Sequence, residues 1–192
     1  MKILKGLVLG AALFVGSTPA MADWKSVDAM SQVAFGSIKK DVVGEVHHFS
    51  GVKGSVSDAG MLKIDIDLAS VETNIDIRNE RMAKHVFAAG TATASITGEI
   101  DMSEINGLKP GEMTVVEVEA QLAFAGSEND IDAEMLVARM SDNRVLVTTS
   151  DFIMISTEDL GIDAGIDELM KLASLPGITR VTPVSIRMVF DK

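Results

Sequence analysis

The chain has 192 residues, a formal net charge of −11 and no cysteine. The lack of cysteine excludes disulfides, thiolate metal sites and thiol chemistry. The negative charge makes nucleic acid and anionic lipid surfaces poor partners. The length suits one domain with a substantial core.

Residues 1–22 have the features of a signal peptide. Lys2 and Lys5 precede an apolar run that is too short for a permanent membrane anchor, and the small-x-small triplet at 20–22 matches a cleavage site. We expect cleavage after Ala22, export to the periplasm, and a mature domain of residues 23–192 without a stable membrane anchor. The alternative is an N-terminal anchor that is retained.

Alternation of apolar and polar residues dominates the chain after residue 30. In residues 61–71 the even positions from 62 to 68 are apolar, whereas 63, 65 and 67 are charged. The pattern recurs in 114–124 and 182–190. Weaker strands are expected at about 31–39, 43–56, 91–101, 131–140 and 144–156, separated by turn signals. About eight such strands predict an antiparallel sandwich or a closed barrel.

Two segments have helical spacing instead. Residues 77–87 follow the strand that breaks near residue 70, and residues 163–174 could be capped by Asp163 and end before Pro176. At the break, Ser70 and Thr73 offer side-chain oxygens for a turn or a cap, and Asn74 tolerates left-handed backbone angles.

Residues that could carry chemistry are sparse. His47 and His48 are adjacent in an expected strand, so they face opposite sides and cannot readily chelate one ion, and His85 lies elsewhere. The acidic stretch 127–134 lacks the glycine and late glutamate of a calcium loop. No nucleophile elbow or phosphate-binding glycine loop is present. We therefore expect no catalytic residue, no metal site and no cofactor, and the roles of the three histidines stay open.

Four stretches of the chain, taken in order, carry a family resemblance. Residues 44–51 (GEVHHFSG) form a run of glycines and an aromatic residue, and residues 67–74 (DLASVETN) end a strand and are followed by Arg78. Residues 122–126 and 157–162 are the later two stretches. In this order they resemble motifs of the YceI family of exported, lipocalin-like proteins that bind polyisoprenoid lipids, in which an aromatic is usual at the position of Val46. The chain is identified as a divergent member over roughly residues 30–190.

The resemblance implies an all-β, eight-stranded antiparallel lipocalin-like barrel, with 77–87 as a short plug helix and 163–174 as a flanking helix. Its lumen would hold a polyprenyl lipid or an isoprenoid quinone, for which the protein is a periplasmic carrier. A dry aliphatic tunnel suits such a tail, because each buried methylene contributes about 0.8 kcal/mol. The expected ligand-binding residues are Phe35, Val46, Phe49, Leu62, Ile64, Ile66, Leu68, Arg78, Phe87, Val118, Leu122, Ile186 and Met188.

Arg78 is open to two roles. It can anchor the plug helix to strand carbonyls or carboxylates, or it can meet a phosphate or quinone oxygen at the pocket mouth. The alternative to a carrier is a structural or interaction module with a filled core that acts through its acidic surface. The head group, the chain length and the choice between monomer and homodimer also stay open.

Overall fold

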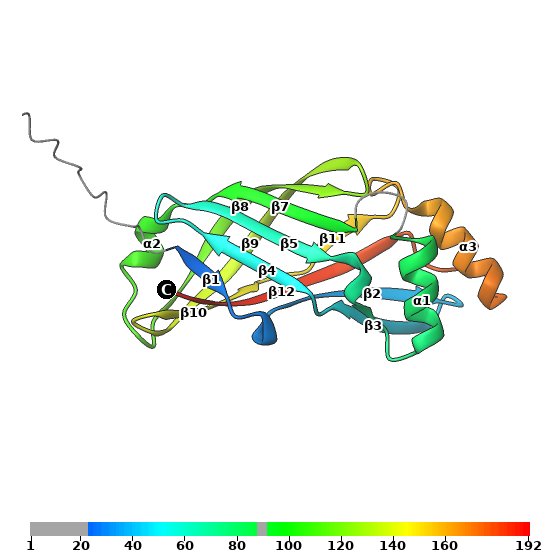
Figure 1. The fold of residues 1–192 in the computed structure, drawn as a ribbon, viewed down its shortest axis with the longest axis horizontal. Coiled ribbons are helices and arrows are strands. Elements are labelled where there is room, and N and C mark those ends of the chain that lie inside the picture. Colours follow the sequence, from blue (N-terminus) through cyan, green and yellow to red (C-terminus); the bar gives the residue numbers. More distant parts are fainter. Residues whose placement is uncertain (1–22, 88–91) are drawn as a thin grey trace, which may run out of the picture.

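The computed structural model describes residues 23–87 and 92–192, and the expected signal peptide lies outside them. The strands form one antiparallel sheet that closes into a barrel, because β1 pairs with both β4 and β12 (Figure 1). The undivided barrel strands are β5 (Met61–Asp67), β7 (Thr93–Glu99), β8 (Met113–Phe124), β9 (Ser127–Ser141) and β12 (Val181–Asp191).

Three further barrel strands are each divided into two pieces. They are β1 (Trp24–Ser26) with β2 (Gln32–Lys39), β3 (Val43–Phe49) with β4 (Val52–Val56), and β10 (Arg144–Thr149) with β11 (Ile153–Ser156). The pieces β1 and β2 both pair with β12, as do β10 and β11. The eight-stranded antiparallel barrel that the family resemblance implied is therefore confirmed, with β6 (Val71–Glu72) added beside β3.

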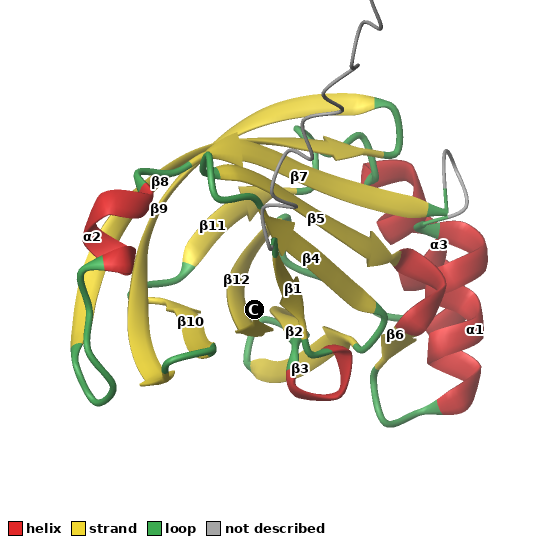
Figure 2. Ribbon diagram, turned by 60° about the vertical axis from the view of Figure 1, so that its left-hand side comes forward, coloured by secondary structure: helices red, strands yellow, loops and turns green. Residues whose placement is uncertain are grey.

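The helices lie at opposite ends of the barrel (Figures 1 and 2). α1 (Asp76–His85) and α3 (Asp163–Ala173) pack together at one end, and we call this pair the helical cover. α2 (Met102–Asn106) lies at the other end, near β1, and the sequence analysis did not predict it. Both helices of the cover were expected, at nearly these bounds.

The expected cap of α3 was wrong. Ile162 precedes the helix, and Asp163 lies in its first turn. There the Asp163 carboxylate accepts a hydrogen bond from the Thr157 hydroxyl and faces Arg180 at 3.4 Å. The Asp163 side chain therefore joins α3 to the neighbouring loop and to the segment before β12.

A corner of side-chain hydrogen bonds ends β5 and leads into α1. The Asp67 carboxylate accepts from the amide of Ala69 at 2.9 Å, and the Ser70 hydroxyl donates to the Asp67 carbonyl at 2.6 Å. Asn74 has a φ of +61°, as its side chain led us to expect. The Asn79 side chain then accepts from the amide of Thr73 at 2.8 Å, which connects the corner to the helix.

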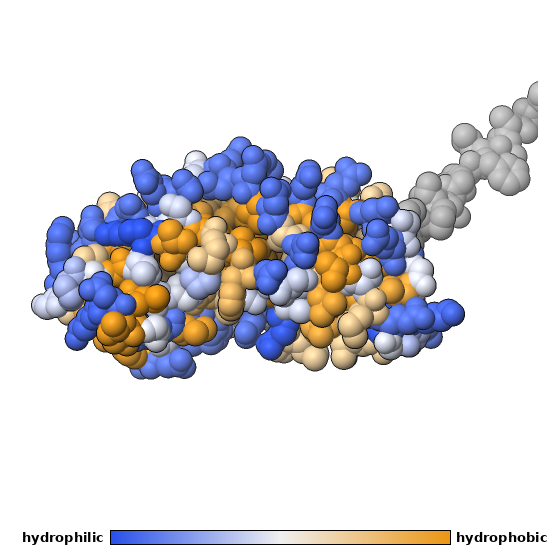
Figure 3. Space-filling model, turned by 180° about the vertical axis from the view of Figure 1, so that it is seen from behind, coloured by the Kyte–Doolittle hydropathy of each residue, from blue (hydrophilic) through white to orange (hydrophobic). Residues whose placement is uncertain are grey.

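The charged faces of the alternating strands lie outside the barrel. Glu117 and Glu119 on β8 are exposed, whereas Leu122 on the other face is buried. Figure 3 shows the molecule from behind, with blue residues over much of the surface and apolar residues gathered toward the middle of that face. Within residues 23–87 and 92–192, no helix is long and apolar enough to cross a membrane.

The lumen is filled in one half only. At the end near α2 and β1, large side chains are buried against one another, namely Trp24, Val52, Val137, Met188 and Phe190. A Cβ at Gly54 would lie 2.8 Å from the terminal methyl of Met188, which shows how closely this half is packed. The half near the helical cover contains a cavity instead.

Gly165 sets how closely the two helices of the cover approach. A Cβ at this position would lie 2.3 Å from the carbonyl oxygen of His85 and 2.8 Å from the Cα of Val86. Both of these are backbone atoms, so neither can move without displacing the end of α1.

The substitution Gly165→Ala should lower the free energy of unfolding by about 1–3 kcal/mol, because the clash outweighs the better helix propensity of alanine. Chemical denaturation measures this loss. Gly107→Ala is the matched control, since the nearest atom to its Cβ would be 3.5 Å away, and its effect should stay within about 0.5 kcal/mol. Equal stability of the two variants would contradict the close helix contact.

Candidate functional site

A cavity of about 400 Å³ lies in the half of the barrel near the helical cover. Its wall consists of inward-facing side chains from β2, β3, β5, β7, β8, β9, β11 and β12, together with α1, α3 and the segments beside them. Most of these side chains are aliphatic or aromatic. This volume and this lining are typical of a binding site for an apolar ligand.

The cavity brings together most of the residues predicted as ligand-binding. Phe35, Phe49, Ile66, Leu68, Arg78, Phe87, Leu122 and Ile186 all line it. Leu68 and Phe87 lie just after β5 and α1, and the other six each come from a different strand or helix, so only barrel closure makes them neighbours. Their contact with a ligand stays a prediction.

The other five predicted residues lie elsewhere. Ile64 and Met188 are buried in the filled half, and Leu62 and Val118 pack partly buried against the same core. Val46 is 71% exposed, so its placement in the lumen was wrong. Successive strand residues face opposite sides, and β3 turns His47 and Phe49 inward, which leaves Val46 outside.

A row of aromatic rings crosses the cavity. Phe35 stacks on Phe49 with ring centroids 5.2 Å apart, Phe49 meets Phe87 at 5.3 Å, and Phe87 meets Phe124 at 6.1 Å. The last two contacts are edge-on, a geometry that aromatic pairs favour. The prediction missed Phe124, although it lies two residues after Leu122 and therefore on the same face of β8.

The sequence analysis also missed lining residues from weaker strands, from the helices and from the segment between β11 and α3. They include Ile96, Ile131, Ile153, Ile155, Met82, Leu160, Ile162 and Ile166. Strand alternation could have identified Ile96, because it lies two residues after Ala94 and therefore on the same face of β7. Lining residues from the helices depend on where the cover docks, which no local pattern reveals.

The charged lining residues gather where α1 meets the β2–β3 hairpin. Arg78 donates to the Glu45 carboxylate at 2.7 Å and to the carbonyl of Thr73 at 2.6 Å, while Lys39 contacts Glu45 at 2.8 Å. The anchoring role expected for Arg78 is therefore present, and the Nε of this residue is buried without a hydrogen-bond partner among the described residues. Burial alone would raise the pKa of Glu45, but hydrogen bonds and charge from Arg78 and Lys39 lower it to about 2.

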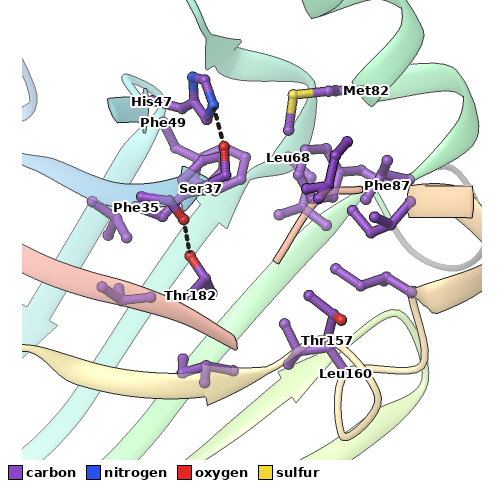
Figure 4. Close-up of a pocket in the computed structure, with 18 of the residues that line it drawn as sticks. Phe35, Ser37, His47, Phe49, Leu68, Met82, Phe87, Thr157, Leu160 and Thr182 are labelled. Carbon is purple, nitrogen blue, oxygen red and sulfur yellow. Dashed lines mark hydrogen bonds between the residues drawn. The ribbon is translucent and has the colours of Figure 1, made fainter. Parts of the chain in front are cut away.

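His47 lies at the same end of the cavity and is only 3% exposed. Its Nε2 shares a hydrogen bond of 3.1 Å with the Ser37 hydroxyl (Figure 4), and its ring lies 5.2 Å from that of Phe35. Burial and the positive charge of Arg78 lower the pKa of His47 to about 4. The imidazole is therefore neutral near pH 7.

The other histidines lie apart from this site. His48 lies on the opposite face of β3 from His47, and His85 lies at the end of α1. Over residues 23–87 and 92–192, no three His, Asp or Glu side chains are grouped so that they could hold a metal ion.

Comparison with known proteins supplies a family and a fold. The family model of the YceI-like domain matches residues 24–189. A polyisoprenoid binding domain from Saccharophagus degradans, implicated in plant cell wall breakdown, is 35% identical with a TM-score of 0.85 and covers 89% of this chain and 98% of that one. Burkholderia cenocepacia BcnA, at 16% identity and a TM-score of 0.64, covers 85% and 98% and shares the fold. No curated protein sequence matches the chain.

Glu45→Gln should lower the free energy of unfolding at pH 7 by about 1–3 kcal/mol, because it leaves Arg78 without a charged partner. The pKa of Glu45 is lowered from its ordinary value of 4.5 to about 2. The carboxylate therefore stabilises the folded protein fully above pH 4.5, and this stabilisation is lost as the pH falls toward about 2. Denaturation of both proteins across this range should therefore give curves that converge in acid.

Asp65→Asn is the control for Glu45→Gln, since Asp65 pairs with Lys63 in a more exposed position. Its effect should stay below about 1 kcal/mol. A loss for Glu45→Gln that does not change with pH would contradict the assigned ion pair.

His47 should make the protein less stable as the pH falls from 6.5 to about 4. The unfolded chain gains a proton on this ring in that interval, whereas the folded chain does not, so the loss reaches about 3 kcal/mol at most. Unfolding experiments at each pH on the wild type and on His47→Leu measure it. The leucine variant should lack this slope, and parallel curves would show that His47 titrates normally in the folded protein.

Proposed function

We propose that this chain, which belongs to the family of YceI-like domains, binds a long apolar isoprenoid lipid and acts as its carrier. The half-hollow lumen is the observation that carries the proposal. A barrel that served only as a structural module would gain stability by filling this space, because empty volume forfeits packing contacts. The 35% identical relative is itself a polyisoprenoid binding domain.

The chemistry of the lining suits a prenyl tail. Branched aliphatic side chains and the row of phenylalanines offer an apolar surface without a precise polar match, so affinity comes mainly from burial at about 0.8 kcal/mol per methylene. The filled half of the barrel stops the tail at one end. The polar residues where α1 meets β2 and β3 lie at the other end, where they would hold the head.

We propose binding rather than turnover, although Ser37 and His47 form a hydroxyl–imidazole pair. A nucleophilic serine needs a base that is itself oriented by a third group. The Nδ1 of His47 is buried without a partner among the described residues. With its pKa lowered to about 4, the imidazole is also a weak general base.

We also propose that the carrier acts in the periplasm. The support is the sequence of residues 1–22, with its basic start, short apolar run and small residues before position 23. The ligand, a polyprenyl lipid or an isoprenoid quinone, would then be shielded from water between membranes.

Native mass spectrometry of the protein expressed with its N-terminal segment, followed by organic extraction, tests the proposal. We expect a stoichiometric adduct that extracts as a prenyl lipid or quinone. Leu122→Trp should lower the occupancy about tenfold or more, because the indole fills space that the tail needs.

Ala123→Trp is the matched control, since its side chain is exposed on the outer face of β8. This variant should keep wild-type occupancy. A protein that carries no adduct and takes up no isoprenoid on incubation would overturn the proposed function.

A further inference from the structure

Two polar atoms stand out in the lining of the cavity. The hydroxyls of Thr157, Thr179 and Thr182 take part in hydrogen bonds with Asp163, Ile38 and Gly36, respectively. By contrast, His47 Nδ1 and Arg78 Nε are buried with no partner among the described residues. A buried polar group without a partner costs free energy, so a ligand that supplies one gains from it.

His47 is held in place through one ring nitrogen, while the other has no hydrogen-bond partner among the described residues. The ring is fixed by the hydrogen bond from Nε2 to Ser37 at 3.1 Å and by Phe35 beside it. Burial and the nearby positive charge of Arg78 keep the ring neutral, so it offers one donor and one acceptor. The Ser37 hydroxyl can donate to Nε2 or accept from it, so this bond is compatible with either tautomer of the ring.

The pair of Ser37 and His47 can meet two kinds of oxygen. When the Ser37 hydroxyl donates to Nε2, Nδ1 carries the proton and donates to a carbonyl. When Nε2 donates to Ser37, Nδ1 accepts from a hydroxyl. Both arrangements keep the bond to Ser37, so the same site suits a carbonyl or an alcohol.

The cations of the cavity lining already have acceptors within the protein. Arg78 already donates to Glu45 at 2.7 Å and to the Thr73 carbonyl at 2.6 Å, and Lys39 contacts the same carboxylate at 2.8 Å. A phosphate beside Arg78 would have to displace the Glu45 carboxylate or tolerate its negative charge. Arg81, the remaining cation of the lining, donates to the carbonyl of Leu172 at 3.4 Å.

We infer that His47, held by Ser37, recognises an uncharged oxygen on the head group of the bound lipid, with Arg78 Nε as a second donor. This inference rests on the proposed function, and it assigns the head group by its chemistry. His47 is then a specificity-determining residue that favours prenyl alcohols and quinones over prenyl phosphates.

Three probes with one tail test it: geranylgeraniol, geranylgeranyl diphosphate and the hydrocarbon with the same carbon skeleton. The wild type should bind the alcohol about 3- to 10-fold more tightly than the hydrocarbon, as one hydrogen bond predicts, and more tightly than the diphosphate. His47→Leu should remove this preference and leave the affinity for the hydrocarbon unchanged. His48→Leu, altered on the outer face of the same strand, should keep wild-type affinities.

Ser37→Ala is a second, milder variant, and it should lower the preference for the alcohol without adding bulk to the cavity. With ¹⁵N-labelled histidine, the Nδ1 resonance of His47 should shift when the alcohol binds and not when the hydrocarbon binds.

The possible failures are distinct. Binding of none of the three probes would overturn the proposed lipid-binding function. Tightest binding of the diphosphate, or an alcohol preference that survives both His47→Leu and Ser37→Ala, would overturn the role of His47 and leave lipid binding intact.

Discussion

The ion pair between Arg78 and Glu45 joins α1 to β3, and much of the site depends on it. The same guanidinium holds the corner through the carbonyl of Thr73, so one side chain connects the helix, the corner and the barrel wall. Its charge also helps to keep His47 neutral. The helical cover is thus attached by polar contacts at the edge of an otherwise apolar cavity, where those contacts cost the least desolvation.

The barrel separates stability from binding along its axis. Trp24, Met188 and Phe190 fill the half near α2, and this packed half supplies the core that an ordinary domain requires. The half near the cover has aliphatic side chains, mostly isoleucine and leucine, and a row of phenylalanines around open space. A ligand that enters this half would replace missing packing contacts, so its binding should also stabilise the fold.

Polar groups in the cavity are few, which makes each of them informative. A tail bound by burial alone would be recognised by its length and not by its head. Ser37, His47 and Arg78 provide hydrogen bonding at one end, whereas Phe87 and Leu122 provide only apolar surface. Selection among lipids with similar tails would then rest on this polar end.

The alternating pattern by itself predicted about eight strands and their solvent-exposed faces, because period-2 alternation is a local property that burial on one side imposes. Helical spacing placed both helices of the cover, and the side chain of Asn74 predicted its left-handed backbone. The expected lining residues wrongly included Val46, since a strand pattern shows which residues share a face but not which face the closed sheet turns inward. Only the tertiary structure decided that half of the lumen is hollow and that Phe87 meets Phe124. Packed and empty interiors are lined by the same residue types, and the difference arises from how distant side chains fill shared space.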